Sequence, residues 1–156
     1  MKIIRLLLSL MLCYLVAFLG SAATFSAIPT WYVTLQKPFF NPPNQIFGPV
    51  WTLLYILIGI AFFLIWEKGF KTKKAQKARN VFFLQLGLNF LWSFVFFSLH
   101  SIFFALVVII ALWISILWTI RLFWGISPRA GNLLVPYLCW VSFATLLNAA
   151  IFLLNR

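Results

Sequence analysis

The sequence predicts an all-α integral membrane protein, a bundle of five transmembrane helices. Hydrophobic residues make up 65% of the 156 residues and charged residues only 8%, whereas a soluble domain carries about 25% charged residues. The hydrophobic residues gather in five runs, and a helix needs about 20 such residues to cross a bilayer. These runs cover approximately residues 3–25, 49–66, 80–97, 102–124 and 133–154. Because only short connections separate them, we expect one domain over residues 1–156.

The first run, residues 3–25, has two interpretations. Basic residues at its start and small residues at positions 20–23 fit a cleavable signal peptide. Small side chains also recur every three or four residues, at Ser9, Cys13, Ala17, Gly20 and Thr24. That spacing places them on one helical face suited to close packing against other helices. We favour a retained first helix, with cleavage as the alternative.

The segment that follows, residues 26–48, is expected to be a loop. Five of the seven prolines lie between positions 29 and 49, so this stretch cannot be one continuous helix. Pro49 suits an early position of the second helix, where its missing N–H costs little. Glu67, the only acidic residue, ends that helix four residues before Lys71, and we expect a solvated pair there. The absence of a second carboxylate excludes mechanisms that need paired acids.

The remaining runs are separated by two polar breaks. A tight turn at Ser98–Ser101 joins the third and fourth helices, and a break at 125–132 precedes the fifth. His100 is interpreted as a turn residue, because a haem would lack a second axial ligand. Cys13 and Cys139 lie in hydrophobic runs without metal-ligand spacing. We therefore expect no metal site and no resident cofactor.

The positions of the basic residues that give the net charge of +11 indicate how the chain is oriented in the membrane. Of the twelve basic residues, six lie between positions 68 and 79. Positive residues near span ends stay on the cytoplasmic side. An N-inside arrangement puts ten basic residues inside and two, Lys37 and Arg156, outside. It makes the N-terminus and the 67–79 loop cytoplasmic and places loop 26–48 and the C-terminus on the outer side. The basic cluster fits anionic lipid headgroups better than nucleic acid, for which no basic groove on a soluble scaffold can be drawn.

Aromatic and amide side chains form stripes on three of the predicted helices. They are Trp51 and Tyr55 on the second helix, Gln85, Asn89 and Trp92 on the third, and Trp140, Ala144 and Leu147 on the fifth. An amide is costly in hydrocarbon unless it finds a partner, so Gln85 and Asn89 should face the bundle interior or a cavity. Any one stripe could simply hold helices together. Three stripes that converge under an irregular loop favour a cavity for a flat, aromatic ligand. Lys37, near the mouth, is either an ordinary interfacial lysine or a partner for a ligand carboxylate.

Residues that match a known family extend along nearly the whole chain. They are Trp31–Tyr32, Leu35, Lys37–Pro38, Pro42–Pro43, Val50–Trp51 and Leu54–Tyr55, then Gln85, Asn89, Trp92, Pro136–Tyr137, Trp140, Ala144 and Leu147–Asn148. On these residues the chain resembles the tryptophan-rich sensory protein, or translocator protein, family, once called the peripheral-type benzodiazepine receptor. The resemblance implies a five-helix bundle, often dimeric, whose first loop caps a pocket for porphyrins, sterols and synthetic aromatic ligands.

The stripes and the resemblance together give the candidate ligand-binding residues. They are Tyr32, Pro42, Trp51, Tyr55, Gln85, Asn89, Trp92, Trp140, Phe143, Ala144 and Leu147. Trp51 and Trp140 resemble the tryptophans that some members use in light-dependent porphyrin breakdown. Ala149 stands where animal members carry the tyrosine of a sterol-recognition pattern, so the resemblance favours a tetrapyrrole role in a bacterial membrane over sterol transport.

Three functions follow as hypotheses. The first is a binding protein for porphyrin-type tetrapyrroles that acts in their handling or in stress sensing. The second is an enzyme that degrades porphyrin with light and oxygen through Trp51 and Trp140. The third is a transporter, for which the sequence lacks the paired intramembrane charges of ion-coupled carriers and any inverted repeat.

Overall fold

The hydrophobic runs form helices because, inside hydrocarbon, each backbone N–H and C=O must find its partner within its own segment. The computed structural model describes residues 1–156 and contains no strands. Its helices are α1 (Lys2–Phe25), α2 (Asn44–Lys68), α3 (Lys73–Ser93, continued by a π-helical turn at Phe94–Ser98), α4 (Ile102–Trp124), α5 (Pro128–Leu133) and α6 (Val135–Leu154). Five segments are long and apolar enough to cross a membrane, counting α5 with α6. The prediction of an all-α, five-helix membrane protein is confirmed.

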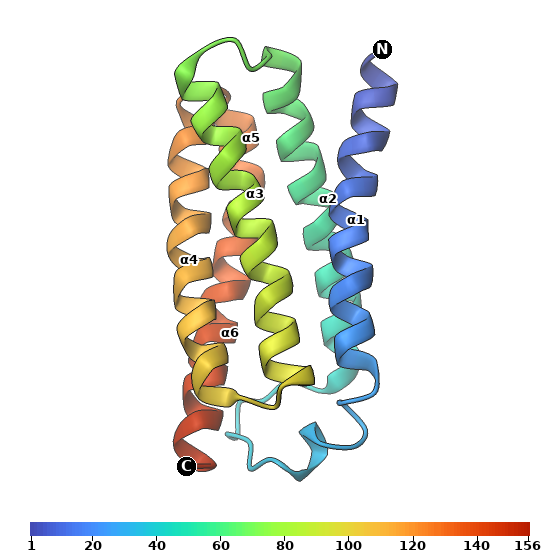
Figure 1. Ribbon diagram of the computed structural model, residues 1–156, viewed down its shortest axis with the longest axis vertical. Coiled ribbons are helices and arrows are strands. Elements are labelled where there is room, and N and C mark those ends of the chain that lie inside the picture. Colours follow the sequence, from blue (N-terminus) through green and yellow to red (C-terminus); the bar gives the residue numbers. More distant parts are fainter.

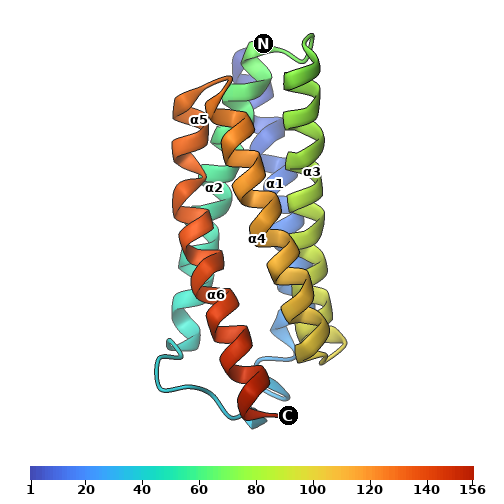
Figure 2. The same cartoon turned by 90° about the vertical axis from the view of Figure 1, so that its left-hand side faces the viewer.

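The helices run roughly parallel to one axis, with distinct groups of residues at the two ends of the bundle (Figure 1). The N-terminus, the connection 69–72 and α5 lie at one end, which we call the basic end. The α1–α2 loop, residues 26–43, and the C-terminus lie at the other end, which we call the loop end. A quarter turn shows α4 between α3 on one side and α5 and α6 on the other (Figure 2). On the far side, α1 packs against both α2 and α3.

Two helices begin earlier than the sequence predicted, and a short helix lies in the break that was expected before the last one. α2 begins at Asn44 instead of residue 49, so Pro49 is its sixth residue and the preceding loop ends at 43. α3 begins at Lys73 instead of residue 80, and most of the predicted 67–79 loop is helical. The break expected at 125–132 contains α5, and only Leu134 separates α5 from α6. Hydropathy locates the part of a helix that crosses hydrocarbon, whereas the helix itself continues into the interface, where polar residues are tolerated.

The small residues of α1 pack against the neighbouring helices, as their spacing predicted. The Ser9 hydroxyl donates to the carbonyl oxygen of Gly59 on α2 at 2.6 Å, and the Cys13 side chain is fully buried. Gly20 faces Ser93 of α3, where a methyl group would already be in van der Waals contact. α1 is therefore an integral part of the bundle.

The single acidic side chain does not pair with Lys71. The Glu67 carboxylate accepts a hydrogen bond from Arg5 of α1 at 3.0 Å. The expected pairing is wrong because α2 ends at Gly69, whose φ of +80° turns the chain away from the helix. Arg5 lies on a helix packed along α2 and reaches the carboxylate instead.

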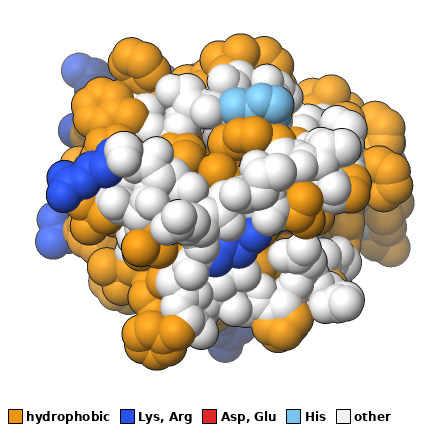
Figure 3. All heavy atoms as spheres, turned by 90° about the horizontal axis from the view of Figure 1, so that it is seen from below, with side chains coloured by type: hydrophobic (Ala, Val, Ile, Leu, Met, Phe, Trp, Pro, Cys, Tyr) orange, Lys and Arg blue, Asp and Glu red, His pale blue; other side chains and the backbone are white.

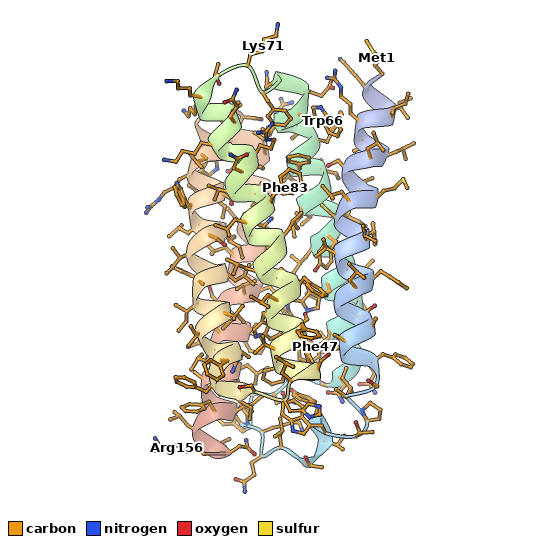
Figure 4. The ribbon with its side chains drawn as sticks, viewed as in Figure 1. Met1, Phe47, Trp66, Lys71, Phe83 and Arg156 are labelled. Carbon is orange, nitrogen blue, oxygen red and sulfur yellow. The ribbon has the colours of Figure 1, made fainter.

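A layer of stacked aromatic rings fills the half of the bundle nearer the basic end. The Phe62 and Phe82 rings are parallel with centroids 4.3 Å apart, and Phe123 stacks on Phe82 at 5.9 Å. Figure 4 places the neighbouring Trp66 and Phe83 in this half, and Phe47 close to the α1–α2 loop. Stacked rings therefore occupy the interior of this half of the bundle.

Candidate ligand cavity

A cavity of about 550 Å³ lies in the half of the bundle nearer the loop end. Its size falls within the range of about 300–1,000 Å³ that is usual for small-molecule sites. Its walls come from α1, the α1–α2 loop, α2, α3 with its π-helical turn, and α6. No charged side chain is among the 24 residues that line it, 15 of which are hydrophobic. Such a cavity suits an apolar, aromatic ligand with few polar groups.

Seven of the predicted ligand-binding residues line the cavity. They are Tyr32, Trp51, Tyr55, Asn89, Trp92, Ala144 and Leu147. The structure therefore brings the three predicted stripes and the loop together around one space. The indole of Trp51 and the phenol of Tyr55 are 5.7 Å apart and form the α2 wall.

Four predicted binding residues and Lys37 are not among the lining residues. These are Pro42, Gln85, Trp140 and Phe143. Gln85 is buried one turn below Asn89, about 6 Å further from the loop end, and its amide has no protein hydrogen-bond partner. Trp140 packs edge-on against Phe47, a lining residue, and beside Phe143. Trp140 and Phe143 thus belong to the layer behind the wall.

The first helix forms a whole wall that the sequence interpretation missed. Its lining residues are Tyr14, Ala17, Phe18, Gly20, Ser21, Thr24 and Phe25. The stripe of small residues was the available signal, since Ala17, Gly20 and Thr24 belong to it. We interpreted that stripe only as a packing face. Ser9, nearer the basic end, packs against α2, whereas Ala17, Gly20 and Thr24, nearer the loop end, line the cavity.

A hydrogen-bonded chain of polar side chains closes the cavity on the side of the basic end. The Tyr55 hydroxyl donates to Asn89 Oδ1 at 2.8 Å, and Asn89 Nδ2 donates to the Tyr137 hydroxyl at 2.7 Å. All three side chains are buried. This polar floor connects α2, α3 and α6, and it satisfies an amide that would otherwise be costly in hydrocarbon.

A second buried amide, Asn148, fixes the orientation of the Trp92 indole in the α3 wall. Trp92 Nε1 donates to Asn148 Oδ1 at 3.1 Å, and Asn148 Nδ2 donates to the carbonyl oxygen of Ile102 at 3.1 Å. The orientation of Trp92 is therefore set by α6 and by the start of α4. Tyr137 and Asn148 are not among the binding residues that the sequence predicts, although both lie in segments that match the family.

The α1–α2 loop covers the cavity and is held by polar contacts. The Tyr32 hydroxyl donates to Asn41 Oδ1 at 2.8 Å within the loop. Burial raises the pKa of Tyr32 to about 12, which keeps this phenol neutral and able to donate. The Lys37 ammonium lies over the Tyr32 ring, 4.7 Å from its centroid, so the charge is folded back onto the roof of the cavity.

Two further contacts attach the loop to the helix ends. Asn155 Oδ1 accepts from the backbone N–H of Gln36, and Asn155 Nδ2 donates to the Gln36 carbonyl, each at 2.9 Å. The Trp31 indole stacks on the His100 imidazole at 4.4 Å. His100 adopts a φ of +54° in the turn before α4, which agrees with its interpretation as a turn residue. Seen from this end, the surface is apolar or uncharged with a few basic groups and no acidic ones (Figure 3).

The sequence matches known proteins over almost its full length. The model of the TspO/MBR family matches residues 9–154. The chain is 49% identical to the tryptophan-rich protein TspO of Archaeoglobus fulgidus, with 99% of each chain covered. It is 44% identical to the tryptophan-rich protein TspO of Chlorobaculum tepidum, covering 99% of this chain and 98% of the relative. It is 37% identical to the human translocator protein, covering 84% of this chain and 78% of the relative. The chain belongs to the TspO/MBR family of integral membrane proteins.

Proposed function

We propose that this protein binds porphyrin-type tetrapyrroles and related flat hydrophobic ligands inside the membrane and acts in their handling or in stress sensing. The observation that carries the proposal is the uncharged cavity of about 550 Å³ with indole walls and a polar floor. Trp51 and Trp92 offer aromatic faces to a flat ring system, and such contacts contribute about 0.5–1.5 kcal/mol each beyond the buried area.

The polar groups of the cavity would orient the ligand. Ring nitrogens or small polar substituents can exchange hydrogen bonds with the floor formed by Tyr55 and Asn89. Lys37, at the roof, would pair with a carboxylate on the opposite edge of the ligand. In this arrangement the α1–α2 loop acts as a lid.

The experiment is a titration of the purified protein with protoporphyrin, followed by the absorbance of the porphyrin itself. Trp51→Ala should raise the dissociation constant about tenfold, because it removes one stacking face. Trp124→Ala is the matched control, because Trp124 is exposed near the basic end and does not line the cavity. Trp140→Ala should have an intermediate effect, since Trp140 contacts the lining residue Phe47 but does not itself line the cavity. Equal affinity in all these variants would contradict the proposed site.

A second candidate is light-dependent porphyrin breakdown. The observation that favours it is the contact between two oxidisable rings, Trp51 and Tyr55, that both line the cavity. Illumination of the bound porphyrin in air should then give products that the Trp51→Phe variant forms more slowly. If the products form at the same rate with and without the protein, the protein does not catalyse breakdown, and binding alone is supported.

We further propose that the basic end faces the cytoplasm of a bacterial cell and the α1–α2 loop faces outward. The charge count supports this orientation, with ten basic residues at one end and two at the other. A hydrophobic ligand would then be covered on the outer side.

A further inference from the structure

The structure contains a second hollow, at the opposite end of the bundle from the cavity. A groove of about 430 Å³ runs between α3 and α4 at the basic end, where the two helices lie side by side in both views (Figure 1, Figure 2). Its lining residues are Lys73, Gln76, Lys77, Asn80, Val81, Leu84 and Trp118. The groove is polar at the helix start and apolar further along α3.

The positive charge around this groove lacks a protein counter-charge. The chain has one acidic residue, Glu67, and Arg5 already pairs with it. Lys73 and Lys77 lie in the first two turns of α3, whose first turn has no acidic residue. Basic side chains at a helix N-terminus oppose the helix dipole and so destabilise the helix. An anion bound here would remove that conflict.

Neighbouring basic side chains are used elsewhere, which leaves two lysines for the groove. Lys74 Nζ donates to the carbonyl oxygen of Gly125 at 2.8 Å, and Arg79 lies over the Phe70 ring and donates to Asn80 Oδ1. Lys77 Nζ lies 5.0 Å from the centroid of the Trp118 ring, so the indole forms the base of the groove beneath the charge. The Asn80 Nδ2 amide makes no hydrogen bond within the protein and can donate to an anion.

The groove is polar at the level of lipid headgroups and apolar at the level of acyl chains, as a bound lipid requires. Along α3, Leu84 lies eleven residues beyond Lys73, about 16 Å deeper at 1.5 Å per residue. α3 with its π-helical turn has 26 residues, about 39 Å, and therefore extends beyond a hydrocarbon layer of about 30 Å. The lysines thus reach the headgroup level, whereas Leu84 and Trp118 reach the acyl chains.

We propose that this groove binds one anionic glycerophospholipid, with its phosphate between Lys73 and Lys77 and an acyl chain along Leu84 and Trp118. The site goes beyond a general attraction of the basic end to negatively charged lipid, because it requires the groove as well as the charge. It does not depend on the function proposed for the cavity.

The test is native mass spectrometry of the full-length protein, incubated in detergent with equal amounts of phosphatidylglycerol and phosphatidylcholine. We expect one phosphatidylglycerol to be retained in preference to phosphatidylcholine. Lys73→Gln with Lys77→Gln should lower its retention about tenfold or more, because it removes the two cationic partners of the phosphate inside the groove. Lys68→Gln with Lys71→Gln is the matched control, because it removes the same charge from the same end outside the groove. Retention should change little there.

A further variant separates the groove from the charge. Leu84→Trp keeps both lysines and fills the apolar part, so it should also reduce retention. Glycerol 3-phosphate at millimolar concentration should leave the lipid in place. An equal loss in the two double variants, no loss in either, or displacement by glycerol 3-phosphate would each overturn the proposal.

Discussion

Asn89 and Gln85 are buried amides on the same face of α3, and they differ in what they bond. Asn89 joins Tyr55 to Tyr137, whereas Gln85 has no hydrogen-bond partner in the protein. A buried polar group stabilises a fold only when its partners are present. The two residues therefore form a natural pair for comparison.

We expect Asn89→Leu to lower the free energy of unfolding by about 1–2 kcal/mol, because it leaves two buried tyrosine hydroxyls without their partner. Gln85→Leu, the matched control, should have no effect or should stabilise, because it removes an unbonded amide. Thermal unfolding of the purified protein in detergent measures both. A larger loss for Gln85→Leu than for Asn89→Leu would show that the floor described here is not an energetic element of the fold.

At the scale of elements, the α1–α2 loop is held to α6 by the two hydrogen bonds between Gln36 and Asn155. Asn155→Ala should loosen the loop and increase the dissociation rate of protoporphyrin severalfold, because it removes two solvent-exposed hydrogen bonds that contribute about 0.5 kcal/mol each. Stopped-flow displacement measures the rate. Arg156→Ala, which changes the neighbouring residue, is the control and should leave the rate unchanged. Equal rates in both variants would mean that opening of the loop does not limit release.

The extent of the elements could be predicted only in part. α4 runs over the predicted residues 102–124, because its hydrophobic run is bounded by Ser101 and Gly125. α3 begins seven residues before its predicted start, because Lys73, Lys74 and Lys77 are polar but lie outside the hydrocarbon. Thr72 explains the true start, since its hydroxyl accepts from the backbone N–H of Ala75 at 3.2 Å. Hydropathy predicts which residues cross the hydrocarbon, whereas capping residues predict where the helix begins and ends.

The residues of the candidate site could also be predicted only in part from the sequence. Helical spacing correctly placed Trp51, Asn89 and Trp92 on inward faces, because angle around a helix follows from sequence. The point at which a cavity ends along a helix does not follow from sequence, so Gln85 was grouped with Asn89 although it lies one helical turn beyond the floor. The α1 wall was missed because small residues indicate close approach equally well in a packed interface and beside a cavity.

At the scale of the whole molecule, orientation can be tested directly. In a variant without Cys13 and Cys139, a cysteine at Phe39 in the loop should react with a membrane-impermeant maleimide on intact cells. Phe39 is fully exposed. A cysteine at Lys71 should react only after the cells are permeabilised, because basic connections stay inside. The reverse pattern would invert the proposed topology.

Met1 and Arg156 lie at opposite ends of the bundle (Figure 1, Figure 4), and Asn155, which binds the loop, directly precedes Arg156. This has a practical consequence for any study that uses a fusion tag. A reporter attached after Arg156 would lie beside the α1–α2 loop and should change the rates at which the loop opens. A reporter attached before Met1 would lie at the opposite end of the bundle from that loop. Binding data should therefore be collected with N-terminal fusions.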